Sequence, residues 1–291
     1  MPFETTIKRP AAVSGVGLHS GAPVAMRLVP AEAGTGIRFR RTDLDGFEIP
    51  AVWRHVAKVS YATSLMREGV LLQTTEHLLS CLYASRIDNL IVEIDNLEVP
   101  IVDGSALPFV EMLQTAGLRT LNRPRRYLKI VRPVEAVDGD KRIRIEPSED
   151  FEIVCESRFD HALVGRQTLS LTIEPEVYAR DIAPARTFGF EADLDQMREM
   201  GLIRGATLEN AVCFGAAGVL NPGGLRFSDE PCRHKLLDLI GDLAMLGKPL
   251  LGRVIATRAG HAMHIALVRQ IMGDPTCYEI SERALVAAAG D

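Results

Sequence analysis

The stretch Arg233-His-Lys-Leu-Leu-Asp-Leu-Ile-Gly-Asp-Leu243 carries three polar side chains, His234, Asp238 and Asp242, four residues apart in an otherwise apolar helix. At 100° per residue, steps of four keep the three within about 80° of one another on one helical face. The opposite face is apolar, and we expect it to be buried; it carries Leu236, Leu237, Ile240, Leu243 and Ala244. One imidazole and two carboxylates on one face can bind a divalent metal, although an ordinary solvated face would show the same pattern.

A second candidate site is Thr74-Thr-Glu-His77, at the start of another predicted helix. His77 could bind a metal while Glu76 reaches a water on that metal. Hydrolytic zinc sites need both parts, because the metal lowers the pKa of water to about 7 and a carboxylate takes its proton. The helix dipole alone would also explain an acidic residue in the first turn. The chain lacks His-Glu-x-x-His, which excludes the common helical zinc-peptidase pattern.

Three loops complete the set of candidate sites. His261, in Ala259-Gly-His261, follows a predicted strand and could lie at the rim of a cleft, or simply be a surface or core histidine. Thr187, in Ala185-Arg-Thr-Phe-Gly189, could offer its hydroxyl to a developing oxyanion, or lie in an ordinary loop. Three glycines in Gly15-Val-Gly-Leu-His-Ser-Gly21 predict a turn where the backbone closely approaches another group. This turn lacks the strand-to-helix setting of a nucleotide-binding loop.

Length and composition limit the class of protein. The 291 residues suffice for one large domain or two medium ones, and 47% hydrophobic and 24% charged residues are ordinary for a globular protein. A net charge of −5 argues against a nucleic-acid partner. The five cysteines form no Cys-x-x-Cys pair, which predicts free thiols in a reducing compartment. The first residues lack the apolar region of a signal peptide, and no apolar run approaches the ~20 residues of a transmembrane segment, so we expect a cytoplasmic protein.

The order of predicted elements is nearly the same in the two halves of the chain. In the first half we expect strands at 5–8, 24–29, 37–40 and 49–53, a helix at 74–85, a strand at 90–94 and a helix at 106–116. After a polar segment at 121–126, which we expect to be a linker, come strands at 127–131, 141–145, 151–157 and 168–173, then a helix at 230–246, a strand at 250–257 and a helix at 261–272. Residues 186–214 interrupt this order and predict an insertion with a short amphipathic helix, and 285–291 predict a flexible tail. The repeated order predicts an α+β fold of two similar domains, residues 1–122 and 127–291.

Eight segments, taken together, resemble a known family. They occur in the family's order, and they are Gly15–Gly21, Thr75-Glu-His-Leu78, Ile87-Asp-Asn-Leu-Ile-Val-Glu93, Pro100-Ile-Val-Asp-Gly-Ser-Ala106 with Pro108-Phe109, Ala185–Gly189, Gly224-Leu-Arg-Phe227, Arg233–Leu243 and Gly260-His261. The family is the zinc-dependent UDP-3-O-acyl-N-acetylglucosamine deacetylases of lipid A biosynthesis in Gram-negative bacteria. The resemblance extends from about residue 5 to about residue 272.

The resemblance implies both a fold and an activity. The fold would be two similar α+β domains, each a β-sheet with two packed helices, forming a sandwich with the active site between them. The insertion, about 188–213, would form a hydrophobic passage for an acyl chain. The activity would be hydrolysis of the N-acetyl group of UDP-3-O-(3-hydroxyacyl)-N-acetylglucosamine, with release of acetate.

The resemblance also assigns roles to residues. It implies one zinc ion per chain with three ligands, which are His77, His234 and Asp238. It implies a general base, a protonated histidine, the carboxylate that holds this histidine and an oxyanion-facing hydroxyl, which are in turn Glu76, His261, Asp242 and Thr187. It implies substrate contacts at Leu18, His19, Lys141, Phe188, Lys235 and Arg258.

The last motif departs from the family, because His264 stands where members usually have Asn. Two other functions stay open: a zinc amidohydrolase of the same fold that acts on another acetylated substrate, and a non-catalytic binder of acyl-sugar nucleotides. The expected partner is a UDP-linked acylated glucosamine. We expect a monomer in the cytoplasm, with peripheral contact to the inner membrane.

Overall fold

The computed structural model describes residues 2–57 and 59–282; the tail predicted at 285–291 lies outside them. The first half of the chain contains β1 (Phe3–Ile7), β2 (Ala11–Val16), β3 (Pro23–Pro30), β4 (Ile37–Arg41), β5 (Phe47–Pro50), β6 (Leu65–Arg67), β7 (Val70–Leu72), α1 (Glu76–Ala84), β8 (Leu90–Ile94), α2 (Leu107–Ala116) and β9 (Leu118–Pro124). Short 3-10 helices occupy Thr42–Leu44 and Trp53–His55.

The sheet of the first half has the order β2-β3-β8-β4-β5. β8 lies at its centre, antiparallel to β3 and parallel to β4. In β3 buried and exposed residues alternate, so that Val24, Met26 and Leu28 face the core while their neighbours face solvent. One face of this sheet is therefore available for helix packing, as the alternating pattern predicts.

The second half contains β10 (Arg126–Ile130), β11 (Val134–Asp138), β12 (Lys141–Glu146), β13 (Phe151–Arg158), β14 (Arg166–Thr172), α3 (Pro175–Val177), β15 (Phe188–Phe190), α4 (Leu194–Glu199), β16 (Val212–Phe214), α5 (Glu230–Leu243), β17 (Leu250–Thr257), α6 (His261–Gly273) and β18 (Tyr278–Glu282). A π-helix (Tyr178–Ile182) follows α3, and 3-10 helices occupy Glu191–Asp193 and Ala244–Leu246. β17 is the central strand, parallel to β10 and β13 and antiparallel to β12.

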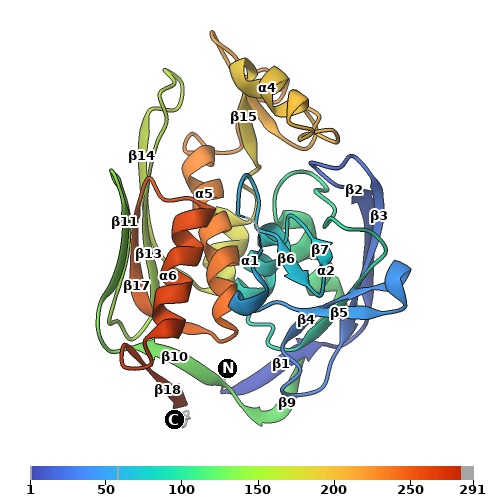
Figure 1. The fold of residues 1–291 in the computed structure, drawn as a ribbon, viewed down its shortest axis with the longest axis vertical. Coiled ribbons are helices and arrows are strands. Elements are labelled where there is room, and N and C mark those ends of the chain that lie inside the picture. The colour runs from blue at the N-terminus through green and yellow to red at the C-terminus, as the bar shows by residue number, and fades with distance from the viewer. Residues whose placement is uncertain (1, 58, 283–291) are drawn as a thin grey trace, which may run out of the picture.

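The two sheets enclose the helices (Figure 1). β11, β13, β14 and β17 form one outer layer, β2, β3, β4 and β5 form the other, and α1, α2, α5 and α6 lie between them. α1 packs directly against α5, which brings the two halves together at the centre of the molecule. This arrangement confirms the predicted α+β sandwich of two sheet-and-helix units.

The insertion projects beyond the sandwich (Figure 1). Its β15 and β16 pair in parallel, and α4 is the predicted short helix. Within the described ranges 2–57 and 59–282, every helix is too short or too polar to cross a lipid bilayer.

The predicted linker at 121–126 is wrong. Residues Leu118–Pro124 form β9, which pairs antiparallel with β1, and β10 begins at Arg126. The guanidinium of Arg125, between the two strands, is buried and bonds Asp88. In the sequence Arg125 suggested an exposed linker. In the structure it pairs with Asp88, a partner that the sequence does not reveal. Besides β9, the strands that were not predicted are β2, β6, β7, β11, β15, β16 and β18.

Candidate metal centre and catalytic site

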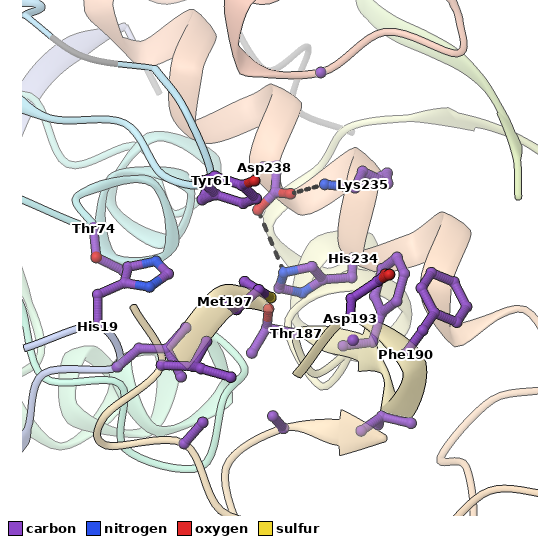
Figure 2. Close-up of a pocket in the computed structure, with 18 of the residues that line it drawn as sticks. His19, Tyr61, Thr74, Thr187, Phe190, Asp193, Met197, His234, Lys235 and Asp238 are labelled. Atoms are coloured by element: carbon purple, nitrogen blue, oxygen red, sulfur yellow. Dashed lines mark hydrogen bonds and ion pairs between the residues drawn. The ribbon is translucent and has the colours of Figure 1, made fainter. Parts of the chain in front are cut away.

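Three donor atoms converge where α1 meets α5. His77 is the second residue of α1, and His234 and Asp238 lie one turn apart on α5. The Oδ1 atom of Asp238 lies 3.4 Å from Nε2 of His234 and 3.8 Å from Nε2 of His77. Figure 2 shows His234 and Asp238 projecting toward each other from α5. All three residues are buried, so the solvated polar face considered from the sequence is wrong.

The spacing and the protonation of this group fit a divalent metal. Ligand atoms ~2.0–2.1 Å from a tetrahedral zinc would lie about 3.3 Å apart, close to the separations seen here. Burial, with the nearby imidazole of His234, lowers the pKa of His77 to about 3. Burial also lowers the pKa of His234, whose Nδ1 lies 3.1 Å from the carbonyl oxygen of Ala185. Both imidazoles are thus neutral and can ligate through Nε2.

Asp238 completes the set as a carboxylate. Burial alone would raise its pKa, but the ammonium of Lys235 and the surrounding histidines outweigh burial and lower the pKa below its ordinary value. Lys235 donates to Oδ2 of Asp238 at 3.0 Å, which leaves Oδ1 facing the two histidines. These three residues can therefore offer two neutral nitrogens and one charged oxygen to a metal.

A second cluster of potential ligands is satisfied by hydrogen bonds instead. Nδ1 of His261 and Nδ1 of His264 lie 2.7 Å and 2.8 Å from the same oxygen of Asp242. The hydroxyl of Thr63 donates to the other oxygen at 2.5 Å. These distances are those of hydrogen bonds, so the carboxylate of Asp242 holds the ring of His261 in place. His264, where the family resemblance led us to expect Asn, shares this carboxylate.

Two titratable groups have pKa values suited to proton transfer. Burial, reinforced by Asp238 and Asp242 and opposed by His261, raises the pKa of Glu76 to about 8. Burial alone would lower the pKa of His261, but Asp242 outweighs it and raises that pKa to about 9. A dication beside Glu76 would favour its charged form and lower its pKa again. The site thus holds a carboxylate able to accept a proton and an imidazolium able to donate one.

These groups lie at one end of a cavity of about 760 Å³. Five of the six predicted substrate-contact residues line it, and they are Leu18, His19, Lys141, Phe188 and Lys235. Thr187, Glu76 and His261 line it as well, while Asp242 lies behind His261. Arg258 is not part of the wall; its guanidinium pairs with Asp140 beside the β11–β12 turn. In the view of Figure 2, Thr187 is drawn below His234, and His19 and Thr74 are drawn farther to the left.

The other end of the cavity is apolar and belongs to the insertion. Its walls include Leu194, Met197, Ile203, Leu208 and Val212 of the insertion, together with Leu220 just beyond it. Phe188 lies between the two ends, 6.2 Å from the ring of His234 and under the ammonium of Lys235. A ligand with a polar head and an aliphatic chain would match this division.

Comparisons with known proteins identify the family of this chain. The family model of UDP-3-O-acyl N-acetylglycosamine deacetylases matches residues 4–273. The chain belongs to this family. Relatives named UDP-3-O-acyl-N-acetylglucosamine deacetylase include those of Solibacter usitatus, 65% identical over 96% of this chain and 95% of the relative, and of Myxococcus xanthus, 46% identical over 95% and 88%. A third, from Syntrophotalea carbinolica, is 42% identical over 100% of this chain and 94% of the relative.

Two residues that support the site of this deacetylase, Thr63 and Glu98, were not predicted from the sequence. The backbone N–H of Thr63 donates to Glu76 at 3.0 Å, so Thr63 contacts both the carboxylate of Glu76 and the group that holds His261. Nothing in the spacing of Tyr61-Ala-Thr-Ser64 indicated this role. The buried carboxylate of Glu98 accepts from the backbone N–H groups of His19 and Ser20 and from the hydroxyl of Thr74.

The close approach predicted for the glycine-rich turn is confirmed at Gly17. A Cβ at this position would overlap the carboxylate of Glu98. The turn also receives hydrogen bonds from the insertion, because Gly205 donates to the carbonyl of Leu18 at 3.0 Å. The three glycines were therefore the sequence feature that indicated a group packed against this turn, and that group is Glu98.

Proposed function

We propose that this protein is a zinc-dependent deacetylase that hydrolyses the N-acetyl group of UDP-3-O-(3-hydroxyacyl)-N-acetylglucosamine in lipid A biosynthesis, with release of acetate. The observation that carries the proposal is the convergence of His77, His234 and Asp238 beside Glu76, at the polar end of a cavity whose other end is apolar. Family membership over residues 4–273 supports the same reaction.

The three converging side chains would hold one zinc ion. Zinc bound there would supply Lewis-acid chemistry, which lowers the pKa of a coordinated water and polarises the amide carbonyl. Glu76 is a buried carboxylate that lines the cavity next to the proposed ligands. A purely structural metal site would not need such a base, which argues against a non-catalytic binder.

The chain's own groups account for the proton transfers. Glu76 takes a proton from the attacking water as a bond forms between the water oxygen and the acetyl carbon. The hydroxyl of Thr187 donates to the carbonyl oxygen as that atom becomes negative. The C–N bond then breaks, and His261, kept protonated by Asp242, gives its proton to the leaving amine. The products are acetate and a free amino sugar.

The two ends of the cavity divide the task of binding. Lys141 and Lys235 supply positive charge for the diphosphate at the polar end. The insertion supplies apolar surface for the acyl chain, worth about 25 cal/mol for each Å² that binding removes from water. Because Arg258 pairs with Asp140 away from the wall, we place it outside this contact set.

The test is to follow acetate release from the acylated UDP-sugar by the zinc-loaded protein. We expect turnover that stops with a chelator and returns when zinc is added back. A matched substrate without the acyl chain should react far more slowly, because it leaves the apolar end of the cavity empty. Absence of acetate release from the acylated sugar by the zinc-loaded protein would overturn the proposal, and release from other N-acetylated compounds alone would indicate a different amidohydrolase.

A further inference from the structure

We propose that Arg186 and Glu230 are a positioning pair that fixes both the metal-facing nitrogen of His234 and the hydroxyl of Thr187. The inference rests on the proposed function in so far as these two residues act there. Neither Arg186 nor Glu230 lines the cavity. Any effect of the pair on the reaction must therefore pass through the residues that it holds.

The pair itself is a buried, two-pronged ion pair. Nε and Nη2 of Arg186 donate to Oε1 and Oε2 of Glu230 at 2.8 Å and 3.1 Å. The backbone N–H of Arg186 adds a third bond to Oε1 at 3.0 Å. The two side chains are 10% and 1% exposed. A planar fork against a carboxylate fixes orientation as well as distance, which a lysine could not do.

The ion pair links the segment Ala185–Arg186 to the helix that carries His234. Glu230 is the first residue of α5, one turn before His234 on the same helix. Ala185, immediately before Arg186, places its carbonyl oxygen 3.1 Å from Nδ1 of His234. A carbonyl can only accept, so Nδ1 must carry the proton and Nε2 is left free to ligate. The ion pair thus anchors the segment that sets the tautomer of His234.

The residue that follows Arg186 is fixed by its own backbone hydrogen bonds. The backbone N–H of Thr187 donates to the carbonyl of Gly104 at 2.8 Å, and its own carbonyl accepts from Val212 at 2.8 Å. Thr187 is thereby held between the first half of the chain and the insertion, directly beside the anchored Arg186.

Glu230 also connects this segment to the loop that carries Gly104. The backbone N–H of Arg226 donates to Oε2 of Glu230 at 2.7 Å. The guanidinium of Arg226 donates to Asp103 at 2.9 Å and to the carbonyl of Pro184 at 2.8 Å. A shift of Glu230 would therefore move the elements on both sides of Thr187.

The first test is the metal affinity of Arg186→Lys, measured by competition with a zinc chelator. Loss of a group that orients a metal ligand typically weakens binding 10–100-fold, and we expect a loss in that range. The matched control is Arg125→Lys, which disrupts a buried ion pair with Asp88 far from the cavity. The control should lower the melting temperature and leave zinc affinity unchanged. Glu230→Gln, which keeps the shape of the side chain, should behave like Arg186→Lys and serves if the lysine variant does not fold.

The second test asks whether the pair acts through Thr187. We expect Arg186→Lys to lower kcat with little change in KM, and to lower kcat less in a Thr187→Ala background than in the natural protein. Wild-type zinc affinity in both Arg186→Lys and Glu230→Gln, with kcat losses that add fully to that of Thr187→Ala, would overturn the inference. Failure of the natural protein to release acetate would instead overturn the proposed function, and would leave the zinc-affinity result standing.

Discussion

Glu76 is the residue whose chemistry is most directly testable. Glu76→Gln keeps the size of the side chain and an oxygen that can accept from the N–H of Thr63, but it removes the base. General-base catalysis is typically worth 10²–10⁴-fold, so we expect kcat to fall by about that factor. Steady-state acetate release measures this loss.

Zinc content is the internal control for this variant. Glu76 is outside the ligand group of His77, His234 and Asp238, so we expect Glu76→Gln to bind one zinc ion as the natural protein does. Full activity in a zinc-loaded Glu76→Gln protein would contradict the role of Glu76 as base.

At the residue scale, spacing brought two of the proposed ligands together, but it did not reveal the residues that support them. His234 and Asp238 share a helix, so a four-residue step alone placed them on one face. Thr63 reaches Asp242 across 179 residues of sequence, and no local pattern encodes such a contact. The same limit applies to Arg258, whose partner Asp140 lies on a separate turn. Residues that meet through the tertiary fold become visible only in the structure or through a family resemblance.

At the scale of elements, the close contact between α1 and α5 depends on Gly241. A Cβ at this position would overlap the backbone carbonyl of Glu76. In a free helix Gly241→Ala would stabilise by ~1 kcal/mol, but overpacking against backbone typically costs 1–3 kcal/mol or more. We therefore expect Gly241→Ala to lower the urea midpoint of unfolding and, because it displaces Glu76, to lower kcat as well.

Gly273, the last residue of α6, provides the matched control. An added Cβ there meets no atom within 4 Å, so Gly273→Ala should be neutral or slightly stabilising. A Gly241→Ala protein as stable and as active as the Gly273→Ala protein would show that α1 and α5 can separate at no cost.

Helices and strands with clear periodicity were predicted nearly to their ends. The strands Leu90–Ile94 and Leu250–Thr257 have the bounds that the sequence predicts, because each is a continuous run of mostly apolar residues between polar ones or turns. The helix α5 was predicted with one buried face, yet both faces are buried, because α1 and β13 pack around it. A polar stripe looks the same in sequence whether it faces water or a metal site.

At the scale of the whole molecule, the order of elements predicted the sandwich because each unit must cover one face of its sheet with its own helices. Two such units bury their helices most completely by packing them together, as α1 and α5 do. The boundary between the units was harder to predict, since β9 and β10 continue the strand structure across it. The division into domains 1–122 and 127–291 stays a prediction.

Because the proposed ligands come from both halves, zinc should connect them as well as serve the reaction. His77 belongs to the first half, and His234 and Asp238 belong to the second. A ligand that binds only the folded state stabilises it by RT ln(1 + [L]/Kd), about 4 kcal/mol when free zinc is 1,000 times Kd. We expect removal of zinc by a chelator to lower the melting temperature and addition of zinc to restore it. In His77→Ala, which removes the ligand of the first half, the chelator should change the melting temperature much less. An unchanged melting temperature in the natural protein after confirmed loss of zinc would mean that the contact between α1 and α5 holds the two halves together without the metal.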